Sequence, residues 1–138
     1  MRKNHFFSAI SKKSPGQFIE NMRENAPKFG FKVHEVVDMK ELYTGYGVKV
    51  TDNFEVYTLT LCSPQKSYKS ITKNPERNAA IIQQKHIIVY RDENGNTVIN
   101  YLLLPKEFLE AIFPRDKEFP ESIKESCRKR IGIIEESL

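Results

Sequence analysis

The stretch His86-Ile-Ile-Val-Tyr90, Arg91-Asp-Glu-Asn-Gly-Asn96 and Thr97-Val-Ile-Asn-Tyr-Leu-Leu-Leu104 decides the fold class. Its two apolar runs are rich in β-branched and aromatic residues, which predicts two strands. The Asn94-Gly95 pair between them favours a tight hairpin, because glycine adopts positive φ angles without a steric penalty. We therefore expect an antiparallel pair of strands here.

The remainder of the chain alternates strand and helix patterns. Three more strands are expected, at 5–10, 31–37 and 54–61, and a possible single helical turn falls around 40–42. Five helices are expected. Three begin where a capping side chain precedes a proline, a fourth begins at a proline alone, and a fifth lies near the C-terminus. These helices begin at Ser14-Pro15, Ser63-Pro64, Asn74-Pro75 and Pro105, and the last covers Glu121 to Ile134.

The predicted order is β-α-β(4)-α with an extra C-terminal helix. Hairpins mixed with helices indicate an α+β fold, with an antiparallel-dominated sheet covered by helices on one face. A length of 138 residues fits one domain. We expect an α+β domain over residues 1–113. Residues 114–138 form a connector and C-terminal helix, part of the same domain or of a dimer interface.

Composition excludes several classes of protein. No apolar run approaches the roughly 20 residues of a membrane span, and the basic N-terminus lacks the apolar region of a secretory signal. We therefore expect a cytoplasmic protein without membrane association. The two cysteines, Cys62 and Cys127, form neither a disulfide framework nor a metal-binding knuckle. His5, His34 and His86 match no compact zinc spacing, so no metal site is predicted.

A net charge of +4 is too small and too dispersed to indicate a nucleic-acid surface. Lys66, Lys69 and Lys73 fall on one side of a predicted helix, with Tyr68 and Ile71 on the opposite side. A solvated helix face explains this pattern equally well, so nucleic acid is an unlikely partner. No Ser-His-Asp order or paired-carboxylate motif identifies catalytic residues, and the sequence indicates no cofactor.

The candidate site lies where the 54–61 strand meets the next helix. Ser63 as N-cap and Pro64 at the first helical position would direct free backbone N–H groups toward the adjacent space. An anion could bind there, with Lys66 adding charge, and the thiol of Cys62 could be an activated nucleophile. Alternatively, Cys62 ends a central strand as an inert buried side chain.

Tyr43 and Tyr46 flank a glycine-rich bend, Gly45-Tyr-Gly47. This bend lacks the third glycine of a dinucleotide fingerprint. The two tyrosines could line a ligand cleft beside the sheet, because pockets favour aromatic walls. The alternative is a peripheral position with each hydroxyl in water.

An ordered series of short motifs resembles the domain-of-unknown-function family 302, from about Phe18 to about Pro105. The series runs Gly30-Phe31, Val36-Val37-Asp38, Gly47, Leu61-Cys62-Ser63-Pro64, Asn74-Pro75, Ile88-Val89-Tyr90. The resemblance implies a β-α-β(4)-α domain similar to the TATA-binding-protein-like fold and a tendency to form dimers. It implies no activity.

This chain departs from the family pattern at two points. The family usually has Cys-Asn-Pro where this chain has Cys62-Ser63-Pro64, and it often has Pro-Cys where this chain has Gln84-Lys85. The second departure removes a cysteine, which argues against a mechanism that needs two thiols.

Three functional hypotheses follow. The first is a homodimer that holds a small anionic or apolar ligand between its sheet and the Tyr43–Gly47 loop, near Cys62, Ser63 and Lys66. The second is a thiol-dependent enzyme or sulfur carrier that uses Cys62. The third is a protein-interaction module that uses the C-terminal helix, whose apolar stripe could equally pack on its own domain. That stripe contains Ile123, Cys127, Ile131 and Ile134.

Overall fold

The computed structural model describes residues 2–3 and 5–138, with side chains from residue 5 onward. Within these residues, an antiparallel sheet of six strands has the order β1-β2-β6-β5-β4-β3. The predicted α+β class is confirmed, and β1 is an additional edge strand. The strands are β1 Arg2–Lys3, β2 Phe6–Ser11, β3 Lys32–Asp38, β4 Val56–Cys62, β5 His86–Arg91 and β6 Thr97–Leu102.

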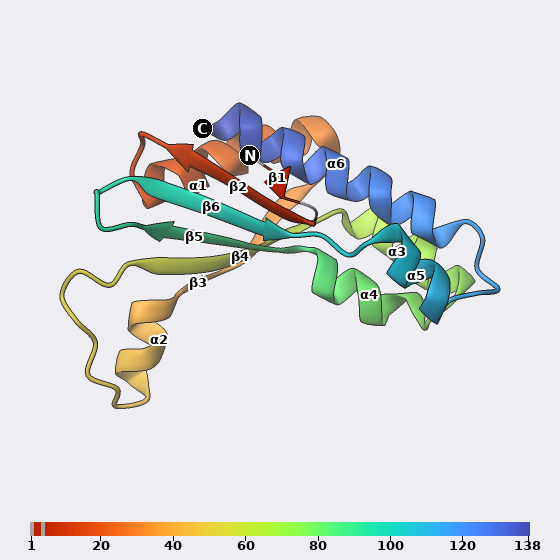
Figure 1. Ribbon diagram of the computed structural model, residues 1–138, viewed down its shortest axis with the longest axis horizontal. Helices are drawn as coiled ribbons and strands as arrows, with labels where there is room; N and C mark the ends of the chain where they lie inside the picture. Colours follow the sequence, from red (N-terminus) through yellow and green to blue (C-terminus); the bar gives the residue numbers. More distant parts are fainter. Residues whose placement is uncertain (1, 4) are drawn as a thin grey trace.

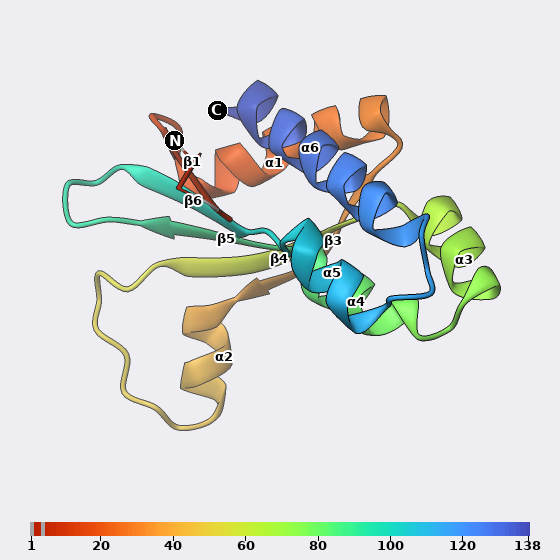
Figure 2. The same ribbon diagram turned by 45° about the vertical axis from the view of Figure 1, so that its right-hand side comes forward.

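The helices α1 and α6 lie side by side on one face of the sheet (Figure 1). The helices α3, α4 and α5 gather at one end of the sheet, whereas α2 lies at the other end (Figure 2). The helical segments are α1 Pro15–Asn25, the 3-10 turn η1 Ala26–Phe29, α2 Met39–Gly45, α3 Pro64–Lys73, α4 Arg77–Gln84, α5 Lys106–Ile112 and α6 Phe119–Ser137.

The predicted hairpin is present between β5 and β6. Gly95 has a φ of +79°, and the carboxylate of Asp92 accepts hydrogen bonds of 2.9 Å from the backbone N–H groups of Asn94 and Asn96. The register pairs Val89 with Ile99, and both side chains are fully buried. Alternate residues of both strands therefore face the helices, as a period of two requires.

The N-terminal helix begins as its sequence predicts. Ser14 Oγ accepts a hydrogen bond of 3.1 Å from the backbone N–H of Gln17, and Pro15 occupies the first turn. Pro27 lacks a backbone N–H, and the chain around it tightens into η1. Gly30, with a φ of +81°, then ends the segment in the left-handed conformation.

The apolar stripe of α6 joins the same core as the sheet. Ile123, Cys127 and Ile134 are at most 5% exposed and pack with Phe18 and Met22 of α1. Ile131 is only partly buried at the edge of this core. The apolar stripe of α6 therefore packs against its own domain. This packing removes the main support for the protein-interaction hypothesis.

Two segments differ from the predictions for physical reasons. The region after β3 contains seven helical residues rather than a single turn, because Asp38 caps α2 by accepting from the backbone N–H groups of Lys40 and Glu41. In β3, the register shifts between His34 and Val37, where Glu35 has a φ of +49°. This bulge breaks the simple alternation expected for the strand.

Candidate functional site

The end of β4 and the start of α3 border a small pocket, which we name the Cys62 pocket. Its volume is about 30 Å³. The side chains that matter chemically come from the β4–α3 junction and from α6, which crosses above it. They are Cys62, Ser63, Lys66, Ser67, Ser126 and Arg130. The structure therefore brings three of the five predicted site residues to one place.

Lys66 points from α3 toward α6 rather than into solvent. Its Nζ donates a hydrogen bond of 2.8 Å to Ser126 Oγ. Burial lowers the pKa of Lys66, and the nearby positive charges of Lys129 and Arg130 lower it further, while Glu125 opposes the shift. The fold therefore keeps a half-buried cation beside two other cations.

Arg130 supplies a second positive charge from α6. Its side chain is deeply buried, with Nε donating 2.8 Å to the backbone carbonyl of Leu61 and Nη1 donating 3.4 Å to the hydroxyl of Tyr101. Its guanidinium also lies 5.1 Å from the ring centre of Phe31. Among the residues that the structure describes, no carboxylate lies within ion-pair distance of Arg130 or Lys66. The pocket therefore carries two positive charges that no direct ion pair neutralises.

Tyr101 holds Arg130 through a buried polar network. The Tyr101 hydroxyl donates 2.7 Å to the backbone carbonyl of Gln84 and accepts 2.9 Å from Gln84 Nε2, and it lies 3.5 Å from Cys127 Sγ. Burial raises the pKa of Tyr101 far above its ordinary value, so the phenol stays neutral. Because the network is satisfied by neutral groups, the positive charge of Arg130 is available to the pocket.

The start of α3 fits the prediction only in part. Ser63 is the N-cap residue and Pro64 occupies the first turn, as predicted, but the Ser63 side chain makes no capping hydrogen bond to the helix. Ser63 has an extended backbone with ψ near 93°, and Ser67 instead donates to the carbonyl of Pro64. In the described part of the chain, no side chain accepts from the backbone N–H groups of Gln65 and Lys66. These N–H groups add to the positive potential.

Tyr43 and Tyr46 do not belong to this site. Both lie at the α2 end of the molecule, and Figures 1 and 2 place α2 and α3 at opposite ends. Tyr43 is 39% exposed with its ring centre 5.9 Å from that of Phe54, and Tyr46 is 80% exposed. The predicted cleft that joins these tyrosines to Cys62 is therefore wrong, because the sheet separates them.

The lysines of α3 do not form one solvated basic face. Lys66 turns inward, Lys73 forms an ion pair of 2.9 Å with Glu118, and Lys69 is exposed. Tyr68, expected opposite the lysines, is 71% exposed. Two of the three lysines of α3 therefore bind to α6 or to the residue just before it.

The sequence reasoning missed Arg130, Ser126, Tyr101 and Gln84. Arg130 is three residues after Cys127 and four before Ile134, so the helical period could have placed it on the buried stripe. No local signal could have found the contact with Leu61, because 69 positions separate the two residues.

The described residues offer neither a metal site of clustered side chains nor a membrane-spanning helix. No group of three histidine, cysteine or acidic side chains is close enough to hold a metal ion. No helix among them combines the length and apolar character needed to cross a membrane.

Comparison with known proteins identifies the fold and family. No curated protein matches the sequence. The crystal structure of an uncharacterized conserved DUF302 protein from Bacillus stearothermophilus superimposes with a TM-score of 0.78. The alignment covers 99% of this chain and 100% of that chain at 17% identity, so it supports the fold alone. The family described as "Domain of unknown function DUF302" matches residues 7–136, which includes nearly all of β2 and of α6. The chain therefore belongs to the DUF302 family.

Proposed function

We propose that this protein is a small-ligand-binding module whose Cys62 pocket takes a small anionic group. One observation carries the proposal: Lys66 and Arg130 line the same pocket, and no carboxylate of the described residues pairs with either of them. A buried positive charge without a partner is costly, and an anion that enters the pocket removes that cost.

The size of the pocket limits the ligand. A volume of about 30 Å³ is about two to three times the roughly 10–15 Å³ that one buried water molecule needs, so the pocket is small. Only the end of a ligand, such as a carboxylate or one face of a sulfate or phosphate group, enters it. The hydroxyls of Ser63 and Ser126 add hydrogen-bond donors, which suits an oxyanion better than chloride.

The proposed module is a homodimer that associates through the sheet face opposite α1 and α6. On this face Phe6, Ile10 and Leu102 are 40%, 57% and 67% exposed. The register places Phe6 beside Leu102 and Ile10 beside Val98. The face carries no charged residue along the centre of the sheet, and depletion of charge is typical of an interface core. Its residues are Phe6, Ser8, Ile10, Val56, Thr58, Ile88, Tyr90, Val98, Asn100 and Leu102.

Thiol chemistry is the second candidate function. Cys62 lines the same pocket as Lys66 and Arg130 and is partly exposed, whereas Cys127 is buried. A cysteine that solvent can reach is open to alkylation or oxidation, whereas a buried one is protected.

An anion series tests the binding proposal. We would measure the melting temperature of the full chain with formate, acetate, sulfate or phosphate, with chloride keeping ionic strength constant at about 0.15 M. An anion that occupies the pocket raises the melting temperature in a saturable way, because it binds only the folded state. Equal melting temperatures in every salt would refute the proposal.

A further inference from the structure

A second and much larger cavity lies on the other side of α6. This groove, which we name the α5–α6 groove, has a volume of about 760 Å³. Its walls come from β2, the segment between β6 and α5, α5 itself and α6. Its apolar surface is formed by Phe7, Leu103, Leu104, Pro105, Cys127 and Ile131.

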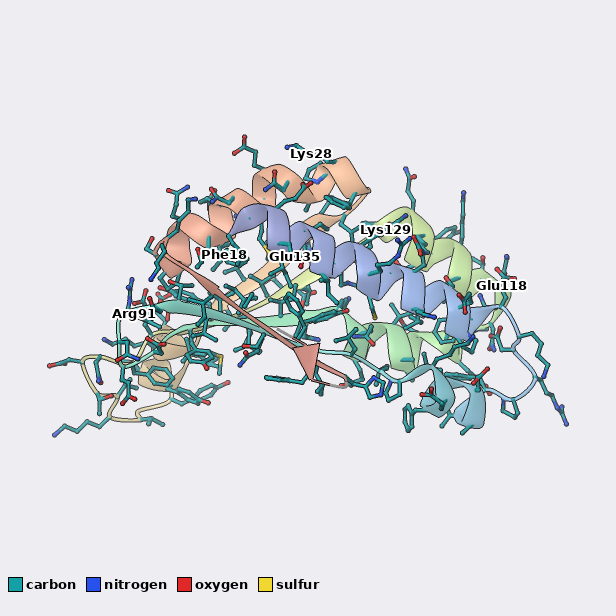
Figure 3. The ribbon with its side chains drawn as sticks, turned by 45° about the horizontal axis from the view of Figure 1, so that its top comes forward. Phe18, Lys28, Arg91, Glu118, Lys129 and Glu135 are labelled. Atoms are coloured by element: carbon teal, nitrogen blue, oxygen red, sulfur yellow. The ribbon has the colours of Figure 1, made fainter. Side chains whose placement is uncertain are left out.

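The α5–α6 groove is separate from the Cys62 pocket. On α6, the groove is lined by Glu121, Lys124, Arg128, Ile131 and Glu135 among others, which recur every three or four residues along one flank. The Cys62 pocket uses the other flank, at Ser122, Ser126 and Arg130. Figure 3 shows Glu135 near the C-terminal end of α6 and Glu118 just before its start. The groove thus follows the helix axis between them.

The charges around the groove nearly cancel. Besides His5, its lining has three basic residues, namely Lys106, Lys124 and Arg128, and four acidic ones, namely Glu107, Glu121, Glu125 and Glu135. Four of the seven form ion pairs: Lys106 with Glu121 at 3.0 Å, and Arg128 with Glu125 at 2.6 Å. The groove therefore has an apolar floor and a rim with no dominant sign of charge, in contrast to the Cys62 pocket.

We propose that the α5–α6 groove binds an uncharged, largely apolar small molecule. Sites for small ligands have volumes of about 300–1,000 Å³ with mainly apolar walls, and this groove falls within that range. Neutral rim charge favours neither an anion nor a cation, so the apolar surface determines the ligand class. The pair between Lys106 and Glu121 joins α5 to α6 at the rim with both side chains exposed. Such surface pairs contribute little, so this one can open to admit the ligand.

Two fluorescent probes with the same aromatic body test the ligand class. N-phenyl-1-naphthylamine is uncharged, and 8-anilinonaphthalene-1-sulfonate adds one negative charge to the same anilinonaphthalene. The chain contains no tryptophan, so tryptophan fluorescence does not interfere with the titration. The uncharged probe should bind wild-type protein with rising fluorescence, and it should bind at least as tightly as the sulfonate.

Variants locate the probe. Ile131→Glu and Leu104→Glu place a charge on the apolar surface of the groove and should weaken binding of the uncharged probe by about tenfold or more. Lys66→Met alters the Cys62 pocket, and Leu102→Glu alters the open sheet face, so both should leave its affinity unchanged. The groove and the Cys62 pocket share no lining residue. Whether Lys66→Met loses anion binding therefore does not affect the proposal for the groove.

The shifts of backbone amide resonances in the wild-type protein give a readout that needs no variant. With the uncharged probe, the largest shifts should fall at 103–107 and along the groove flank of α6. Any of three results would overturn the proposal: no binding of the uncharged probe, shifts centred on 98–102 of the sheet face, or a sulfonate probe that binds about tenfold more tightly.

Discussion

Lys66 Nζ donates a hydrogen bond of 2.8 Å to Ser126 Oγ and so joins the start of α3 to the middle of α6. The bond holds the ammonium group half-buried beside Arg130 and Lys129, in surroundings that lower its pKa. A lowered lysine pKa means that the charged form is less favourable in the folded state than in the unfolded state. Holding the charged form of Lys66 at this position therefore destabilises the folded state. Such a cost to stability is typical of binding sites.

The two cysteines should differ sharply in reactivity. Cys62 is partly exposed and Cys127 is 3% exposed, so iodoacetamide should alkylate Cys62 of the native protein about tenfold faster or more. Peptide mass spectrometry over time measures both rates, and Cys62→Ser isolates the slow site. Equal rates would contradict the structure.

The pH dependence of the same reaction tests the thiol hypothesis. If the alkylation rate of Cys62 rises with pH and reaches half its maximum well below about pH 8.5, the ordinary thiol value, the result would support an activated nucleophile. A half-maximal rate near pH 8.5 would mean that Cys62 only lines the pocket and is not an activated nucleophile.

Tyr101→Phe should lower the free energy of unfolding by about 1–3 kcal/mol. The change removes one hydroxyl, which accepts from Gln84 Nε2 and Arg130 Nη1 and donates to the carbonyl of Gln84, and the Gln84 amide keeps only its bond to the carbonyl of Leu102. Urea unfolding measures the effect. Tyr68→Phe is the matched control, because Tyr68 is 71% exposed, and it should change stability by less than about 0.5 kcal/mol. Equal effects of the two substitutions would disprove the buried network.

Asp116→Asn should lower the free energy of unfolding by about 2–3 kcal/mol. The Asp116 carboxylate accepts two hydrogen bonds from Arg77, of 2.6 Å and 2.7 Å, and both side chains are at most 10% exposed. Removing the carboxylate leaves the guanidinium charge without its partner. Glu118→Gln is the control, because its pair with Lys73 is exposed, and it should cost less than about 1 kcal/mol.

The same pair predicts a pH dependence. Hydrogen bonds from Arg77 lower the pKa of Asp116 below its ordinary value of 3.8. The unfolded chain then binds a proton at a higher pH than the folded chain, so this contribution is complete above about pH 4 and is lost as the pH falls below it. Asp116→Asn should flatten the acid side of the stability profile. A profile with an unchanged acid slope would contradict the low pKa.

Leu102→Glu should convert a homodimer to a monomer. Leu102 is 67% exposed on the open sheet face, and a charge there would be buried in the proposed interface. Sedimentation velocity gives the mass. Tyr46→Glu is the matched control, because Tyr46 is 80% exposed on a different surface. A wild-type monomer, or a dimer that survives Leu102→Glu, would refute this interface.

The sequence predicted best where local chemistry decides the structure. Asn94-Gly95 has the turn residues of a hairpin, and Ser14-Pro15 has the residues of a helix start; both are present. Ser63 also occupies the N-cap position before a proline, but its side chain makes no capping hydrogen bond, and its ψ of 93° differs from the 158° of Ser14. The β3 bulge at Glu35 likewise carries no recognisable local signal.

The candidate site was only half predictable because half of it comes from α6. Cys62, Ser63 and Lys66 lie within five consecutive positions of the sequence. Their proximity can therefore be predicted without knowing how the helices pack. Arg130 reaches the carbonyl of Leu61 only after α6 packs on the sheet. The misplacement of Tyr43 and Tyr46 has the same origin, since no local signal shows at which end of the sheet α2 lies.

The most direct test of the anion pocket compares the melting temperatures of wild-type protein, Lys66→Met and the exposed control Lys69→Met, each with and without sulfate at constant ionic strength. Without sulfate, Lys66→Met should be at least as stable as wild type, because it removes a half-buried charge next to two cations. Sulfate should then stabilise wild type and Lys69→Met but leave Lys66→Met unchanged. An equal sulfate shift in all three proteins would contradict the account.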